Sequence, residues 1–166
     1  MSYQLAERLE NRIQPAKQQL GRVLVVEDDE LVSRILVRAL SSLSLEVRAV
    51  ECASSAQDQL SSTSFDAIFS DLRLPGEDWQ SVLHAARAID PNVPFIILTG
   101  GPDLSSAATC LAAGVSRYLL KPVAPKILQT IAAAAVEQSR TARLLQCMPG
   151  GRERARALFS VSPRIP

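Results

Sequence analysis

Hydrophobic residues follow two different patterns along the middle of the chain. Uninterrupted apolar runs at 23–26, 67–69 and 95–98 are typical of strands that are buried on both faces. Between them, apolar residues recur every three or four positions, which predicts helices over 30–43, 53–62, 79–89, 104–113 and 124–147. Residues 46–51 alternate polar with apolar and 116–120 are mixed, so both suit strands at the edges of a sheet.

Several helix boundaries can be predicted from single residues. Asp78 and Asp103 precede two of the apolar stripes and are good N-caps, and Ser54 or Ser55 is the candidate cap for the helix over 53–62. The helix over 30–43 carries its stripe on the residues Leu31, Val32, Ile35, Leu36, Ala39, Leu40 and Leu43. The whole stripe is expected to face the core.

Five strands alternating with five helices predict an α/β fold with helices on both faces of a parallel sheet. The three apolar strands belong in the middle, and the second and fifth strands suit the edges. Right-handed crossovers then favour the strand order 2-1-3-4-5, which is the flavodoxin-like, doubly wound arrangement. In such a sheet a functional site is expected at the carboxyl ends of the strands.

The length of 166 residues favours a single domain with extensions. We expect an N-terminal extension over 1–20, in part helical, a domain over 21–146 with a long last helix, and a flexible tail or linker over 147–166. The net charge of +1 gives no reason to expect direct binding to nucleic acid or to a membrane. No apolar stretch approaches about 20 residues, and a secretory signal is lacking, so a cytoplasmic location is expected.

The three cysteines are widely spaced and form no CxxC pair, which argues against a disulfide framework and against a zinc site. Cys52, Cys110 and Cys147 are therefore expected to be small buried hydrophobic residues.

Polar residues stand at the ends of four predicted strands. Glu27 and Asp28 follow the first strand, Asp71 ends the third, Thr99 ends the fourth and Lys121 follows the fifth. Neighbouring strands lie about 4.8 Å apart, so the carboxylates would flank one another. Lys121 begins two strands from Asp71, at roughly 10 Å, and only its long side chain would reach the centre.

This set of residue types suits phosphoryl transfer. Three carboxylates in close proximity repel unless a cation lies among them, and oxygen ligands without His or Cys favour Mg²⁺, with Mn²⁺ as an alternative, over zinc. A lysine and a threonine hydroxyl can contact phosphate oxygens. Asp71 would be the nucleophile and would form an aspartyl phosphate.

Four motifs in this order resemble the receiver domain of two-component response regulators: VVEDDE at 25–30, SDLRLPGED at 70–78, ILTGG at 97–101 and YLLKP at 118–122. The resemblance covers about residues 21–146. It implies that Asp71 accepts phosphate, that Thr99 and Lys121 hold the phosphoryl group, and that Glu27, Asp28 and the backbone carbonyl of Arg73 join Asp71 as metal ligands. It also implies a cis bond between Lys121 and Pro122, and slow loss of the phosphoryl group without classical enzymatic turnover.

The resemblance further implies partners and a switch. The phosphate donor would be a phosphohistidine on a sensor histidine kinase or on a histidine phosphotransfer protein. Tyr118 would turn inward as Thr99 moves and would remodel the face made by 104–113, 116–120 and 124–147. That face would contact a downstream protein or effector domain. A homodimer would form either through the same face or through the terminal helices. From the residues alone, Tyr118 is also explained as an edge-strand core residue.

Two positions depart from the family pattern. Trp79 stands where the family often has Gly, and is expected to change packing and access beside the site. Arg73 is bulky, and the resemblance suggests that its side chain and Gly101 influence how fast water reaches the phosphoryl group.

Three other functions fit the sequence less well. A haloacid-dehalogenase-like phosphatase needs a second Asp two positions after the nucleophile, where this chain has Arg73. A flavin carrier needs a phosphate-binding loop after the first strand, where this chain has acids. A receiver-like adaptor that works without phosphorylation stays open, although all the expected site residues are present.

Overall fold

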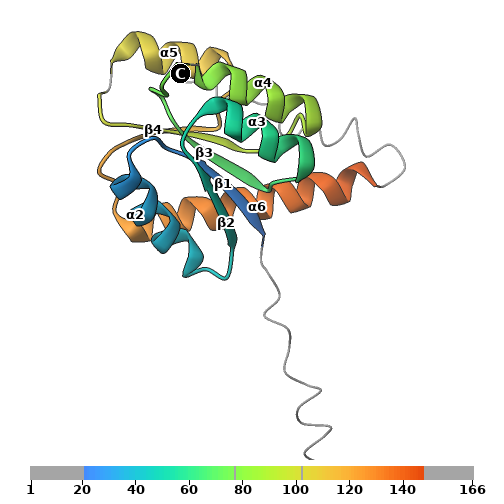
Figure 1. Cartoon of the computed structure of the whole chain (residues 1–166). Helices are drawn as coiled ribbons and strands as arrows, with labels where there is room; N and C mark the ends of the chain where they lie inside the picture. Colours follow the sequence, from blue (N-terminus) through green and yellow to red (C-terminus); the bar gives the residue numbers. More distant parts are fainter. Residues whose placement is uncertain (1–20, 77, 102, 148–166) are drawn as a thin grey trace, which may run out of the picture.

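The computed structural model describes residues 21–147 except 77 and 102, and these residues form a five-stranded parallel sheet with helices on both faces (Figure 1). The strands are β1 (Arg22–Val26), β2 (Glu46–Val50), β3 (Ala67–Asp71), β4 (Phe95–Thr99) and β5 (Arg117–Leu120). Their order is β2-β1-β3-β4-β5, so the predicted flavodoxin-like order and both predicted edge strands are confirmed.

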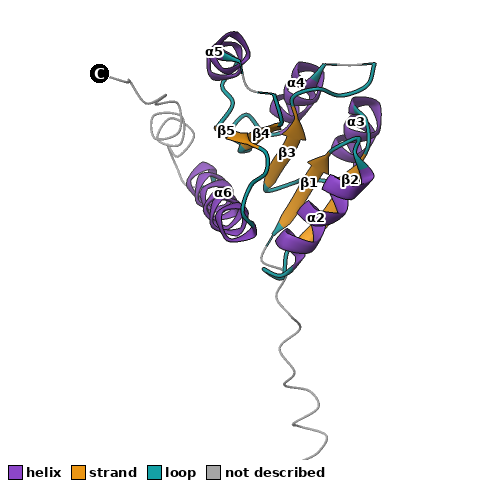
Figure 2. Cartoon of the chain, turned by 90° about the vertical axis from the view of Figure 1, so that its left-hand side faces the viewer, coloured by secondary structure: helices purple, strands orange, loops and turns teal. Residues whose placement is uncertain are grey.

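Five helices cover the sheet in two layers: α2 (Glu30–Ser41), α3 (Ala53–Ser62), α4 (Trp79–Ile89), α5 (Leu104–Ala112) and α6 (Pro125–Gln146). α2 and α6 lie on one face, and α3, α4 and α5 lie on the other (Figure 2). None of these helices has the length and hydropathy that a membrane-spanning segment needs.

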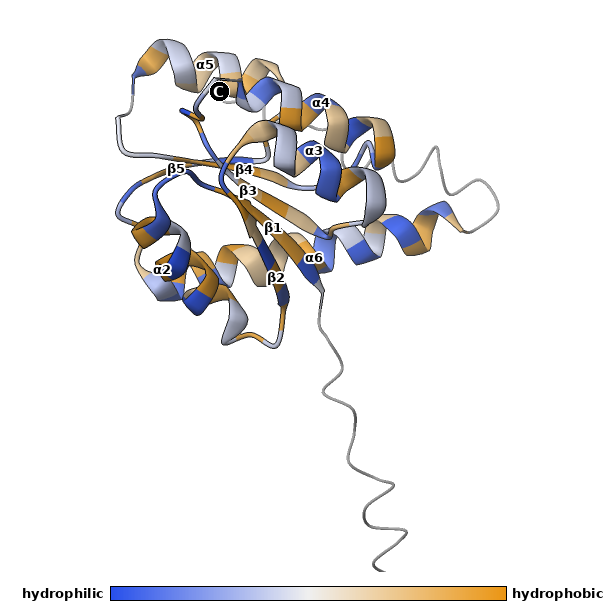
Figure 3. Cartoon of the chain, in the orientation of Figure 1, coloured by the Kyte–Doolittle hydropathy of each residue, from blue (hydrophilic) through white to orange (hydrophobic). Residues whose placement is uncertain are grey.

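The apolar strand runs supply two separate cores because successive side chains point to opposite faces. Leu24 and Ile68 pack under α3 and α4, while their neighbours Val25 and Phe69 pack under α2 and α6. All four side chains are fully buried. The hydropathy colouring shows the apolar strands between the two helical layers (Figure 3).

Three aspartates cap helices through their side chains. Asp78 and Asp103 cap α4 and α5 as predicted, and Asp29 caps α2 by accepting hydrogen bonds from two backbone N–H groups. The prediction of a serine cap for α3 was wrong. Cys52 is the N-cap, because the helix begins at Ala53, whose side chain is fully buried in the core.

The apolar stripe of α2 reaches the core only in part. Leu36, Ala39 and Leu40 are buried as predicted. Leu31 and Ile35, however, are 68% and 53% exposed, so the prediction that they face the core was wrong. Val32 at the same end of α2 packs against the core, so the difference is one of helix face: Leu31 and Ile35 lie at the side of the stripe, turned away from the buried Leu36 and Leu40.

The cysteine prediction holds for one residue. Cys110 is buried in the core, Cys52 is partly buried and Cys147 is exposed. The exposed position of Cys147 follows from its place at the C-cap of α6. All three thiols are free.

The last turns of α6 are fixed to the start of two strands. Arg143 donates hydrogen bonds to the Asp66 carboxylate at 2.7 Å and to the Phe65 carbonyl at 2.8 Å. The other oxygen of Asp66 accepts the backbone N–H of Arg22 at 2.8 Å. The helix therefore packs on the domain at least as far as Arg143, while the predicted extension over 1–20 and most of the predicted tail lie outside the described residues.

Candidate functional site

The strand ends bring the predicted site residues to one edge of the sheet. Asp71 is the last residue of β3, and Thr99 is the last residue of β4. Glu27 directly follows β1 and continues its ladder, because its N–H bonds to the Val50 carbonyl at 2.9 Å. Lys121 follows β5 in the same way, with its N–H 2.7 Å from the Thr99 carbonyl.

The alternation of side chains decides which of these groups meet. Glu27 and Asp71 stand two residues after Val25 and Phe69, and therefore emerge on the face covered by α2 and α6. Lys121 stands two residues after Leu119, which packs on the same face. Thr99 and Tyr118 emerge on the opposite face, because Ile97 and Tyr118 pack with the core under α3 and α4.

Lys121 connects two of the carboxylates. Its Nζ donates hydrogen bonds to Glu27 Oε2 at 2.6 Å and to Asp71 Oδ2 at 2.8 Å. The three side chains are largely shielded from solvent, with exposed fractions of 19%, 1% and 14% for Lys121, Glu27 and Asp71. A long side chain from the edge strand thus reaches the centre of the site, as the strand spacing predicted.

The electrostatics of this cluster are strongly coupled. Burial raises the pKa of the Glu27 carboxyl above its ordinary value, and the bond to Lys121 offsets that rise only in part. Burial acts to lower the pKa of the Lys121 ammonium, but its hydrogen bonds to Asp71 and Glu27 outweigh this effect and the pKa is raised. The site thus holds more negative charge than a single lysine compensates.

Three carboxylates can hold a cation together. One oxygen each from Glu27, Asp28 and Asp71 lies within 4.8 Å of the other two. Glu27 is buried, Asp71 is partly buried and Asp28 is exposed, so the cluster is open on one side. A set made only of carboxylate oxygens fits Mg²⁺, which binds through one or two carboxylates and keeps several waters.

The loop after Asp71 covers part of the site. The Arg73 N–H donates to Asp71 Oδ1 at 3.3 Å, and a backbone bridge joins Arg73 to Asp78. The Arg73 guanidinium leans over the loop after β4, because a Cβ built on Gly101 would lie 3.5 Å from its Nη2 atom. Arg73 and Gly101 are thus neighbours beside Asp71, and their influence on water access stays a prediction.

Thr99 contacts the loop after β4, and Tyr118 packs in the core on the same face of the sheet. Thr99 is 1% exposed, and its Oγ1 accepts the Gly101 N–H at 3.2 Å. The Tyr118 ring packs against the core under α3 and α4, and its hydroxyl oxygen is buried without a hydrogen-bond partner. This placement agrees with the alternative reading of Tyr118 as a core residue, and it leaves a switching role as a proposal.

Two further predictions concern residues beside the site. The Lys121-Pro122 bond is cis, as expected. Trp79 is 5% exposed and its ring lies 6.4 Å from that of Phe95, so it alters core packing. The side chain packs in the core, and an effect on access to the site stays a prediction.

The contact between Lys121 and Glu27 was not predicted, because Glu27 was expected only as a metal ligand. The alternation of side chains along a strand could have indicated this contact. Two positions before each of Glu27, Asp71 and Lys121 stands an apolar residue that packs on the same face of the sheet.

Comparison with known proteins agrees with this fold. The sequence model described as "Response regulator receiver domain" matches residues 23–133. The chain belongs to the response regulator receiver domain family.

Two curated relatives are regulators. The chain is 36% identical over 112 residues to the swarming motility regulation protein RssB of Serratia marcescens, a match that covers 67% of this chain and 51% of RssB. It is 35% identical over 104 residues to the DNA-binding transcriptional regulator NtrC of Escherichia coli K12, covering 63% of this chain and 22% of NtrC. The match thus spans about half of RssB and about a fifth of NtrC.

Solved receiver domains share the fold. The receiver domain of sensor histidine kinase PA1611 from Pseudomonas aeruginosa PAO1 superimposes with a TM-score of 0.64 at 31% identity, covering 70% of this chain and 98% of that one. That structure has a magnesium ion coordinated in its active site cleft. A CheY-like receiver domain protein from Methanospirillum hungatei JF-1 gives a TM-score of 0.69 at 24% identity, covering 74% and 98% of the two chains.

Proposed function

We propose that this receiver domain accepts a phosphoryl group on Asp71 from a phosphohistidine of a partner protein. The observation that carries the proposal is the contact of Lys121 with both Asp71 and Glu27, because it gathers the nucleophile, an acidic group and a cation from three strand ends. In the reaction, a carboxylate oxygen of Asp71 attacks phosphorus. The bond from phosphorus to the histidine nitrogen breaks, and that nitrogen keeps the electron pair.

Each of the other site residues has a role in this proposal. Glu27, Asp28, Asp71 and the backbone carbonyl of Arg73 would hold Mg²⁺. When bound, this ion supplies positive charge against the carboxylates and the phosphoryl oxygens. Lys121 can move from Asp71 to a phosphoryl oxygen as the Asp71 carboxylate becomes an acyl phosphate, since its ammonium stays within the same site. Thr99 contributes a hydroxyl donor from the adjacent strand.

The partner that donates phosphate would bind over α2. Leu31 and Ile35 are exposed on this helix, and they lie on the turns that follow Asp29, its N-cap beside Asp28. Ile127 is 55% exposed in the first turns of α6, which packs beside α2. Such apolar residues around an acidic site would give a histidine kinase or histidine phosphotransfer protein a surface to pack on while its phosphohistidine reaches Asp71.

The state of the site would be read on the face made by α5, β5 and α6. Leu104, Leu111 and Leu120 are 91%, 52% and 53% exposed on α5 and β5. Phosphorylation would draw Thr99 toward the phosphoryl group, and Tyr118 would follow it on the same face of the sheet. This change would alter binding of a downstream protein or effector domain, or of a second receiver.

A direct test is incubation with Mg²⁺ and a small phosphodonor such as acetyl phosphate, followed by intact mass measurement. Wild type should gain one phosphoryl group, which should be lost slowly after the donor is removed. Asp71→Asn should gain none, and Asp58→Asn, which alters an exposed carboxylate of α3, should behave as wild type. A wild-type chain whose mass does not change would favour an adaptor that binds partners without phosphorylation.

A further inference from the structure

α5 is attached to the domain unevenly along its length. Among its nine residues, Cys110 is the one whose side chain is buried. Leu104 at the opposite end is 91% exposed. Cys110 packs in the core under α3 and α4, so the apolar contact that holds α5 to the sheet lies in its C-terminal half.

The C-terminal end of α5 is also held by an arginine from the neighbouring helix. Arg87 of α4 donates from Nη2 to the Gly114 carbonyl at 3.0 Å and from Nη1 to the Pro91 carbonyl at 2.5 Å. The last carbonyls of a helix and of the turn after it lack partners within the helix. The Arg87 guanidinium therefore joins the turn after α4 to the turn after α5, through two charged hydrogen bonds that are stronger than neutral ones.

The backbone supports the same end. The Val115 N–H bonds to the Cys110 carbonyl at 3.0 Å, and Gly114 between them takes a φ of 83°, a left-handed conformation that suits glycine. The side chain of Val115 is 6% exposed and packs in the same core as Cys110. The turn from α5 to β5 is therefore fixed by backbone, side-chain and apolar contacts.

Among the described residues, which exclude 102, the N-terminal end of α5 shows no comparable ties to the rest of the domain. The cap residue Asp103 accepts hydrogen bonds from Ser105 and Ser106, which belong to the first turn of its own helix. Gly100 is exposed, and a Cβ built on it would meet nothing within 4 Å. This end adjoins Thr99, so the part of α5 nearest the site is also the part that is least attached.

We propose that Arg87 is a positioning residue that holds the C-terminal end of α5 in place. The helix then pivots at Gly114, and its N-terminal end moves. The anchor itself depends only on the contacts of Arg87. The trigger rests on the proposed function, because the movement would start where Thr99 responds to a phosphoryl group. Leu104 would then be displaced far more than Leu111, and the exposed apolar face of α5 would change mainly at its Leu104 end.

Amide hydrogen exchange measured by NMR on the full chain tests the anchor without any ligand. The amides of Ala107 and Val115 are both hydrogen-bonded, to the carbonyls of Asp103 and Cys110. Val115 should nevertheless exchange at least about tenfold more slowly, because its end of the helix opens less often. Equal rates at these two positions, or faster exchange at Val115, would overturn the proposal.

Substitution of the arginine tests its role. In Arg87→Met, exchange at Val115 should rise by about tenfold, as expected for the loss of charged hydrogen bonds. Exchange at Ile96, in the buried strand β4, should change much less. Arg38→Met, which removes an exposed arginine of α2, should leave both positions unchanged. An unaltered Val115 in Arg87→Met, or an equal rise at Ile96, would show that Arg87 does not anchor α5 specifically.

Addition of Mg²⁺ and beryllofluoride to wild type separates this proposal from the proposed function. Exchange should change at Ala107 and stay the same at Val115. Equal changes at both ends would overturn the pivot about Gly114. A chain that shows no response anywhere, yet keeps slow exchange at Val115 and the effect of Arg87→Met, would refute the phosphoryl site and leave the anchor supported.

Discussion

Glu27 and Lys121 stand 94 positions apart in the chain, and their charged groups meet at 2.6 Å. The glutamate follows β1 and the lysine follows β5, with β3 and β4 between them in the sheet. The same ammonium also bonds Asp71 at the end of β3. One lysine thus joins three strand ends, and its removal should affect both stability and metal binding.

Lys121→Met should lower the free energy of unfolding in metal-free buffer by about 3 kcal/mol, because it leaves the buried Glu27 carboxylate without its partner. Urea unfolding followed by circular dichroism measures this loss. The double variant Glu27→Gln/Lys121→Met should lose less, since the unpaired charge is removed with the lysine. Mg²⁺ should restore more stability to Lys121→Met than to wild type. Equal losses in the single and double variants would mean that the two groups are not coupled.

Arg73→Ala should shorten the lifetime of the phosphorylated chain several-fold. The guanidinium of Arg73 leans over Gly101 beside the acceptor, and its removal opens a path for water. The lifetime is measured by intact mass at intervals after the phosphodonor is removed. Gly101→Ala is the control for folding, and its stability should stay within about 0.5 kcal/mol of wild type. An unchanged lifetime in Arg73→Ala would mean that Arg73 does not shield the phosphoryl group from water.

The fluorescence of Trp79, the single tryptophan in the sequence, should report on the site from within the core. Trp79 follows the cap residue Asp78, which is bridged to Arg73 in the loop after Asp71. Ordering of that loop should change the emission when Mg²⁺ is added, and again with beryllofluoride. Both changes should be weaker in Asp71→Asn. An emission spectrum that stays constant through both titrations would argue against the assigned site.

Asp103 should make the stability of α5 depend on pH in acid. Hydrogen bonds from Ser105 and Ser106 lower the pKa of this carboxyl well below its ordinary value of 3.8. A lowered pKa contributes stability above the unfolded value, and that contribution is lost as pH falls through the folded value. The advantage of wild type over Asp103→Asn in urea unfolding should therefore be constant between pH 7 and about 5 and should shrink below about 3.8. A difference that persists unchanged at pH 3 would show that the charge of Asp103 is not involved.

Arg143→Met should detach the end of α6. The arginine bonds Asp66 and the Phe65 carbonyl, but it is 40% exposed, so solvent weakens the ion pair. A loss of about 1.5 kcal/mol in unfolding free energy is expected, with faster hydrogen exchange in the last turns of α6. Arg38→Met, at an exposed position of α2, should cost much less. Similar losses in the two variants would mean that the contacts of Arg143 add nothing specific.

The sequence predicted the parts of the fold that depend on local pattern. Apolar runs marked the buried strands, and an alternating and a mixed segment marked the edges, so the strand order followed. The site residues were located for the same reason, because parallel strands end at one edge and each of four ends carried a polar residue. The cap at Asp103 could be predicted since its hydrogen bonds lie within one helical turn.

Predictions failed where a residue's environment depends on how the elements pack against one another in three dimensions. Leu31 and Ile35 have the spacing of core residues, but they lie at the side of the stripe, turned away from the buried face of α2. Ser54 had the right chemistry for a cap, but the cap is Cys52, two residues earlier, and α3 begins at the buried Ala53. The roles of Arg87 and Arg143 could not be predicted, because Arg87 bonds the distant Gly114 carbonyl and Arg143 bonds the distant Asp66 carboxylate, which no local pattern reveals.

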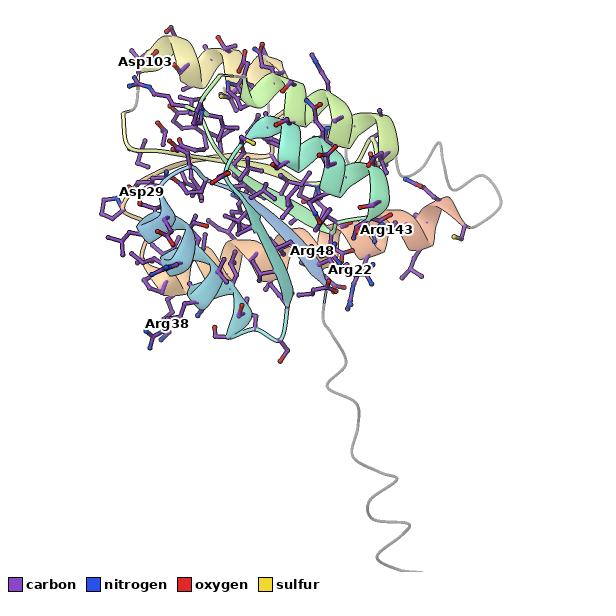
Figure 4. All side chains as sticks on the ribbon, in the orientation of Figure 1. Arg22, Asp29, Arg38, Arg48, Asp103 and Arg143 are labelled. Carbon is purple, nitrogen blue, oxygen red and sulfur yellow. The ribbon has the colours of Figure 1, made fainter. Side chains whose placement is uncertain are left out.

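The bonds around Asp66 also determine where neighbouring parts of the polypeptide would attach. Asp66 holds both the beginning of β1 and the end of α6, and it lies five residues before Asp71 along β3, about 16 Å away. In Figure 4, Arg22 and Arg143 are found together at the end remote from Asp29 and Asp103. Segments joined at either terminus of the described region would thus start on the far side from the acceptor. A donor protein would therefore approach Asp71 at the opposite end of the sheet from Arg22 and Arg143.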